Sequence, residues 1–70
     1  MIKVGQIYQT RQGTVALVTA YNEEEFFVIS KDGSSNRLPI IFSCELETNC
    51  KLIAEYPTWQ EAVNSKEFKE

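Results

Sequence analysis

The most reactive side chains of this sequence are two cysteines. Cys44 and Cys50 are separated by five residues, with no second cysteine cluster beside them. The chain has no histidine, so it lacks the commonest general base, the commonest zinc ligand and the base that would activate a thiol. Lys51 follows Cys50, but adjacent strand residues point to opposite faces. We therefore predict no enzymatic activity, no metal site and no cofactor.

The two cysteines also bear on the cellular compartment. They flank residues 45–49, which we expect to form a loop between two strands, so a cross-strand disulfide is geometrically compatible. The N-terminal residues carry one charge and no apolar run, which predicts the absence of a secretory signal and a reducing, cytoplasmic environment. We favour two free, mostly buried thiols over a bridge, and the sequence leaves both open.

Acidic residues form no candidate catalytic pair. Glu23, Glu24 and Glu25 fall at a predicted loop tip, and Glu45 and Glu47 lack a third ligand or a base.

The formal net charge is −3, and no basic stripe is visible. Since phosphate neutralisation provides most of the affinity for nucleic acids, we expect no nucleic-acid partner. No apolar run approaches the roughly 20 residues of a membrane span, so we expect no membrane association either.

Binding chemistry is better represented than catalysis. Aromatic and tyrosine side chains near turns and strand ends are typical of interfaces. The only two arginines lie beside predicted loops, where a guanidinium suits planar anions. The candidate binding residues are Tyr8, Arg11, Tyr21, Phe26 and Arg37. In the alternative interpretation, the tyrosines cap the core and the arginines are solvated.

Strands must position most of these residues, between about residues 4 and 55. β-prone segments are separated by turn formers such as Gly13 and Asp32-Gly33. The expected strands are 7–10, 14–21, 26–31, 37–42 and 50–55. Pro39 cannot donate to a ladder, which predicts an edge or bulged fourth strand.

The pattern becomes helical after Tyr56-Pro57. Thr58 and Glu61 have the spacing of a capping box, which predicts a helix over about residues 58–64. Trp59 lies on the apolar face of this helix and is expected to anchor it on the sheet. Phe68 follows a stop signal and is expected to pack back.

The second and third strands predict apolar side chains on both faces of their hairpin. Pairing Tyr21 with Phe26 places Leu17 opposite Ser30 and leaves both faces largely apolar. A one-sided antiparallel sheet would show a polar face. We therefore expect both faces to be covered, one by a closed barrel and the other by the C-terminal helix or another subunit.

The order of these elements resembles that of a known group of proteins. It combines Lys3-x-Gly5-x-Ile7-Tyr8, Gly13 before Val15-x-Leu17-Val18, a strand ending at Lys31-Asp32-Gly33, and Trp59-Gln60-Glu61-Ala62-Val63. Over about residues 3–64 this layout resembles small bacteriophage proteins with an SH3-like barrel. The resemblance implies a mainly β single domain over residues 1–70, a small five-stranded antiparallel SH3-like barrel with a short C-terminal helix. The family's known roles are mostly in binding, as inhibitors of host defence proteins, virion adaptors or sponges for signalling molecules.

Three functional hypotheses follow. The first is a phage-type protein-binding module that inhibits a host defence protein, with a host or phage protein as partner. The second is a homo-oligomeric binder or sponge for a small anionic, nucleotide-like ligand, with pockets built between subunits from Tyr8, Arg11 and Arg37. The third is a structural virion or assembly component. If the chain is phage-encoded, its expected location is the host cytoplasm.

Overall fold

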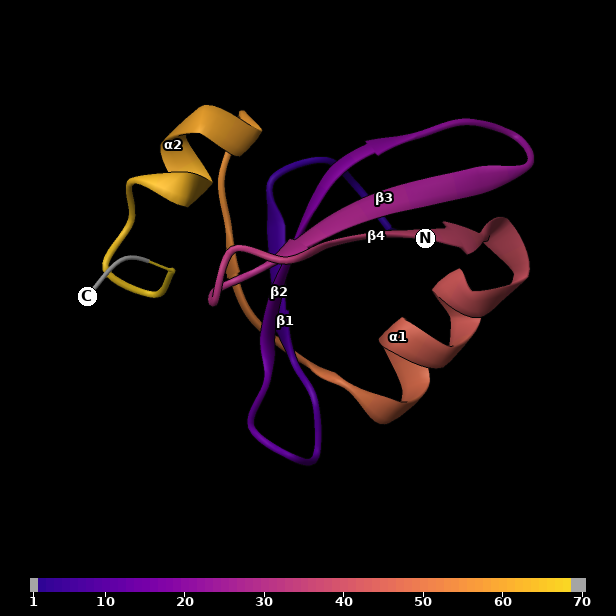
Figure 1. Cartoon of the computed structure of the whole chain (residues 1–70), viewed down its shortest axis with the longest axis horizontal. Coiled ribbons are helices and arrows are strands. Elements are labelled where there is room, and N and C mark those ends of the chain that lie inside the picture. The colour runs from indigo at the N-terminus through magenta and orange to yellow at the C-terminus, as the bar shows by residue number, and fades with distance from the viewer. Residues whose placement is uncertain (1, 69–70) are drawn as a thin grey trace.

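The computed structural model describes residues 2–68 and consists of five strands, one 3₁₀ helix and two α-helices (Figure 1). The elements are β1 (Gln6–Gln9), β2 (Val15–Tyr21), β3 (Glu25–Ser30), β4 (Ser35–Pro39), η1 (Ile40–Phe42), α1 (Ser43–Asn49), β5 (Lys51–Glu55) and α2 (Trp59–Val63). The strands form one antiparallel sheet in the order β4-β3-β2-β1-β5. The prediction of a mainly β chain with a five-stranded antiparallel sheet and a short C-terminal helix is confirmed.

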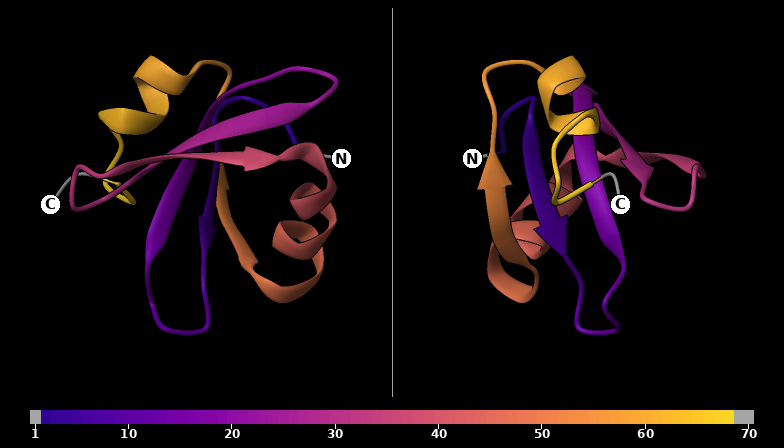
Figure 2. Two further views of the ribbon diagram at one scale, coloured as in Figure 1. Left: turned by 45° about the vertical axis from the view of Figure 1, so that its right-hand side comes forward. Right: turned by 90° about the vertical axis from the view of Figure 1, so that its left-hand side faces the viewer.

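The sheet is open, so the prediction of a closed barrel is wrong. β4 and β5 are its two edges, and the segment that joins them forms η1 and α1 (Figures 1 and 2). The expected strand over residues 37–42 ends at Pro39, which has no N–H for a ladder. The expected loop over residues 45–49 is helical, consistent with its Glu and Leu residues, which are good helix formers.

A β-bulge shifts the register of β2 against β3. Tyr21 pairs with Phe26, as predicted, but the register shifts between Val18 and Ala20. Thr19 is the extra residue, and its hydroxyl donates to the carbonyl of Phe27 at 3.3 Å. Leu17 therefore lies opposite Ile29 instead of the predicted Ser30.

Both faces of the sheet bear an apolar core, as predicted. The α1-side core comprises Ile2, Tyr8, Ala16, Val18, Phe26 and Val28, with Leu38, Ile40, Leu46 and Cys50 packed against it. The α2-side core comprises Ile7, Leu17, Ala62 and Phe68, with further side chains from β3, β5 and α2. The two helices thus cover opposite faces of the sheet, in keeping with their positions at opposite sides of the molecule in Figure 1.

The C-terminal helix begins where the capping residues predict. The Thr58 hydroxyl accepts a hydrogen bond from the Glu61 N–H at 3.2 Å, and α2 then runs to Val63. Phe68 packs back into the α2-side core, as predicted. Trp59, however, is 40% exposed, and Ala62 is the fully buried contact of the helix. The small Ala62 side chain lets α2 lie close to the sheet, so the expectation that Trp59 anchors it is wrong.

Both cysteines are free thiols, as favoured by the sequence. Cys44 is exposed, so the expectation of two mostly buried thiols is wrong for this residue. Helical geometry separates positions 44 and 50 by about 9 Å along the axis, more than a disulfide spans. An intrachain bridge would require α1 to unwind.

Candidate binding site beside α1

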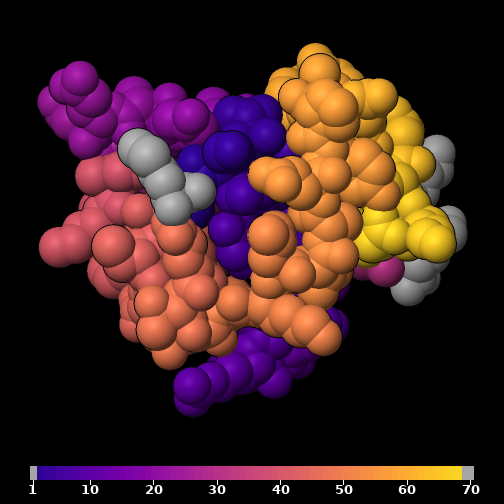
Figure 3. Space-filling view, turned by 180° about the vertical axis from the view of Figure 1, so that it is seen from behind, coloured from indigo at the N-terminus to yellow at the C-terminus, as the bar shows by residue number. Residues whose placement is uncertain are grey.

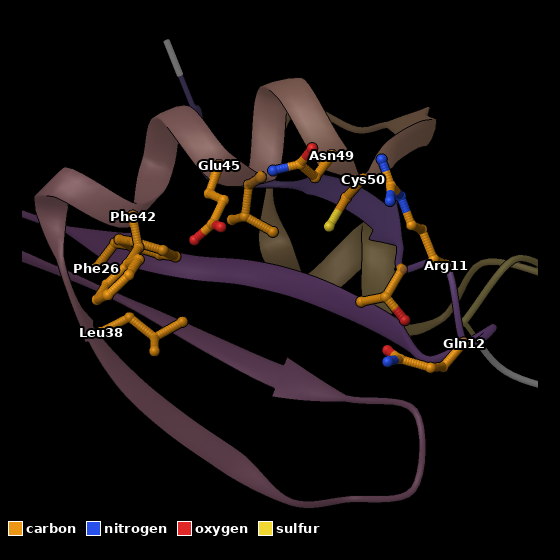
Figure 4. A pocket seen from close by; sticks show the side chains of 10 residues that line it. Arg11, Gln12, Phe26, Leu38, Phe42, Glu45, Asn49 and Cys50 are labelled. Carbon is orange, nitrogen blue, oxygen red and sulfur yellow. The ribbon is translucent and has the colours of Figure 1, made fainter.

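A pocket of about 520 Å³ lies between α1, β4 and the β1–β2 turn (Figure 4). Its apolar lining comes from Phe26, Leu38, Phe42, Leu46 and Cys50. Its polar lining comes from Thr10, Arg11, Gln12, Glu45 and Asn49. We call this hollow the α1 pocket.

The apolar part of the α1 pocket is built on paired strands. Phe26 of β3 is fully buried and lies opposite Leu38 of β4 in the sheet. Leu46 of α1 packs against the same core as these two residues. The pocket is hollowed beside well-packed side chains, which fix its shape.

Arg11 is presented by the tight turn between β1 and β2. The Gly13 N–H donates to the Thr10 carbonyl at 2.9 Å, and Gly13 has the positive φ of 90° that the turn requires. Glu45 reaches the same pocket from the first turn of α1. In Figure 4, Arg11 and Gln12 lie toward one end of the pocket, whereas Phe42 and Glu45 lie toward the other.

The structure brings only two of the five predicted site residues into this pocket. Arg11 and Phe26 both line it, and Phe26 is fully buried. Tyr21 is 45% exposed and lines a different hollow, together with Ile2 and Ile40. The predicted residues therefore do not form one site within a chain.

Arg37 lies in another hollow, which is lined by residues of β2, β3 and β4. Its Nε is 3.3 Å from a carboxylate oxygen of Glu25. It thus lies in a different hollow from Arg11 within one chain, and the pocket expected between subunits from Tyr8, Arg11 and Arg37 stays a prediction.

Tyr8 is buried in the α1-side core, with 4% of its surface exposed. Its hydroxyl donates to Oε1 of Gln6 at 2.9 Å, and Nε2 of Gln6 donates to Glu55 at 3.0 Å. Burial raises the pKa of Tyr8 above its usual value, and the carboxylates of Glu47 and Glu55 raise this pKa further. The phenol is therefore a neutral member of a buried hydrogen-bond network.

Two residues that the sequence did not single out dominate the surface beside the pocket. Ile41 is 74% exposed and Phe42 is 45% exposed. Both line a hollow that adjoins the α1 pocket and also includes Cys44 and Thr48 of α1, here called the second hollow. Phe42 lines this hollow and the α1 pocket, so we call Ile41 and Phe42, with the exposed side of α1, the α1 ridge.

The α1 ridge lies at one side of the molecule. Seen from behind, the segment from η1 through α1 lies next to β5 and away from α2 (Figure 3). The four-residue spacing of Phe42, Leu46 and Cys50 is typical of one face of a helix and was the available signal for this arrangement.

Comparisons with protein-family models, curated proteins and solved structures find no significant match to this chain. Within residues 2–68, no group of three or more His, Cys, Asp or Glu side chains is placed to hold a metal ion. None of the helices in this part of the chain has the length and apolar character needed to cross a membrane.

Proposed function

We propose that this chain is a non-enzymatic protein-binding module and that the α1 ridge is its contact surface. The observation that carries the proposal is the exposure of Phe42, which lines two adjoining hollows, and of Ile41, which lines one of them. Large apolar side chains exposed next to concave surface are typical of interaction sites. Aromatic anchors surrounded by polar groups also carry most of the free energy of protein association.

The charges of the α1 pocket favour this function over binding of a small anion. Arg11 is the only basic residue among those that line the pocket, and Glu45 lines it too. Arg37 is engaged with Glu25 in another hollow. A single chain therefore offers no two-arginine site, and an anion sponge would have to build its pocket between subunits.

The resemblance to small phage proteins supports a narrower proposal. We infer that the module is phage-type and acts in the host cytoplasm by covering part of a host defence protein. Such an inhibitor needs a stable contact surface and no chemistry of its own. The α1 ridge supplies large apolar side chains for that contact.

The test is capture of a partner from bacterial lysate by the immobilised chain, with matched surface variants. We expect one reproducible partner for the wild type, and loss of that partner with Phe42→Ser and with Ile41→Ser. Loss of a central anchor costs about 2 kcal/mol or more, roughly a 30-fold weaker complex. Trp59→Ser is the control, because Trp59 is 40% exposed but lies on α2.

Each variant is first shown to be folded by circular dichroism. Retention of the partner by the Ile41→Ser and Phe42→Ser variants, or its loss only with Trp59→Ser, would contradict the proposed surface. Failure to capture any reproducible partner would count against the function itself.

A native mass spectrum of the purified protein separates this function from the ligand-binding hypothesis. A bare monomer or dimer is expected for the protein-binding module. A symmetric oligomer carrying a few hundred daltons of extra mass would instead support a small-ligand sponge.

A further inference from the structure

The α1 pocket carries two charges of opposite sign that no residue from 2 to 68 neutralises. Arg11 and Glu45 both line the pocket, and neither forms an ion pair with any residue from 2 to 68. The other polar residues of the lining are uncharged. These two side chains therefore define the charge pattern that a ligand of the pocket meets.

We propose that the α1 pocket binds a peptide segment of the partner in which an apolar side chain lies between an acidic and a basic residue. The apolar side chain occupies the part of the pocket beside Cys50, between the two charged side chains (Figure 4). The acidic residue pairs with Arg11, and the basic residue pairs with Glu45. This inference rests on the proposed function and specifies the chemistry of its partner.

The physical reason is the cost of removing water from a charge. A ligand seated on the apolar lining displaces water from both ends of the pocket. A charge that is left unpaired after desolvation weakens a complex strongly. An uncharged ligand would leave both Arg11 and Glu45 unpaired, and a ligand of one sign would be repelled by one of them. A bipolar ligand satisfies both.

The geometry favours a peptide over a free zwitterion. The two charged residues lie toward different ends of the pocket, and Asn49 and Cys50 lie between them in Figure 4. Phe42 and Glu45 also line the second hollow, so the binding surface continues across the α1 ridge. A ligand that fills only the pocket would leave Ile41 uncovered, whereas a partner chain extends over it.

The test uses synthetic peptides with one central Phe or Leu and charged residues on both sides. Three sets are compared by fluorescence polarisation: Asp with Lys, Asp with Asp, and Lys with Lys, each at several spacings. The wild type is expected to bind the mixed set about tenfold or more tightly than either single-sign set. Free phenylalanine is the probe for a small zwitterion.

Charge reversal makes the test specific. The variant Arg11→Glu is expected to shift the preference to the Lys–Lys set, and Glu45→Arg to the Asp–Asp set. Both side chains are exposed, so both variants are expected to fold. Arg37→Glu is the control, since Arg37 lies outside the pocket and is expected to leave the preference unchanged.

Several results would overturn the inference. They are equal binding of all three peptide sets, a preference that both reversals leave unchanged, full competition by free phenylalanine, or no binding of any peptide. None of these results changes the outcome of the capture experiment, in which Phe42→Ser is tested for loss of the partner. Failure of the charge pattern and failure of the proposed function are therefore distinguishable.

Discussion

Gly5 provides the most direct test of how this fold is held together. It has a φ of 94°, and a Cβ added to it would lie 2.1 Å from the carbonyl oxygen of Tyr56. Its N–H donates to the Val18 carbonyl, and its own carbonyl accepts from the Tyr56 N–H, both at 3.0 Å. Gly5 thus joins β2 to the segment that follows β5.

The cost of Gly5→Ala follows from these contacts. The left-handed conformation costs an L-residue about 1–2 kcal/mol. Loss of the two hydrogen bonds adds about 0.5–1.5 kcal/mol each, because the backbone must move to relieve the clash. The total is about 2–5 kcal/mol, comparable to the ~3–5 kcal/mol that a core of this size supplies. We expect Gly5→Ala to be largely unfolded at room temperature, as measured by urea titration with circular dichroism.

The matched controls are Gly13→Ala and Gly33→Ala. These glycines have φ values of 90° and 98°, but a Cβ at either position meets no atom within 4 Å. Both variants should lose only the conformational cost, about 1–2 kcal/mol, and remain folded. Equal destabilisation of all three variants would refute the argument that close backbone approach at Gly5 dominates.

Three further outcomes are expected. Thr58→Ala should lower the free energy of unfolding by about 1 kcal/mol through loss of the helix cap, and Thr58→Ser should restore it; urea titration measures both. Since the pKa of Tyr8 is raised, its contribution to stability is complete below pH ~10 and falls as the pH rises through the folded-state pKa. Tyr8→Phe should therefore reduce the loss of stability at alkaline pH, measured as the free energy of unfolding. The comparison is made in a Tyr56→Phe background, because the pKa of Tyr56 is also raised, through its hydrogen bond to Glu67. Amide protons of α1 should exchange faster than those of β2, and equal protection would contradict a weakly held helix.

The strands and their turns were largely predictable because they depend on local chemistry. Asp32-Gly33 marks the β3–β4 turn, where Gly33 takes a positive φ and the Asp32 carboxylate accepts from the Ser34 N–H at 2.9 Å. Thr58 marks the start of α2 in the same way. The bulge at Thr19 was not predictable, since nothing in a strand that is apolar on both faces indicates which residue will be left unpaired.

The segment from residue 40 to 49 was misread for a physical reason. It has room for only a few turns, so its helical period rests on Phe42, Leu46 and Cys50 alone. The apolar run before it fits a strand equally well, and a short apolar run does not distinguish the two. Arg11 and Phe26, which line the α1 pocket, were singled out from the sequence, but Ile41 and Phe42, which lie in the misassigned segment, were not.

The helical segment that joins β4 to β5, where a strand and a loop were predicted, is also the segment of the proposed function. α1 has seven residues, none of them buried, and no side chain caps its start at Phe42. So short a helix has little intrinsic stability and depends on the contacts of Leu46 with the α1-side core. A direct strand between β4 and β5 would place its side chains alternately on the two faces. The turn at η1 instead leaves Ile41 and Phe42 exposed and places Glu45 at the pocket, so the segment that joins β4 to β5 also forms the proposed binding surface.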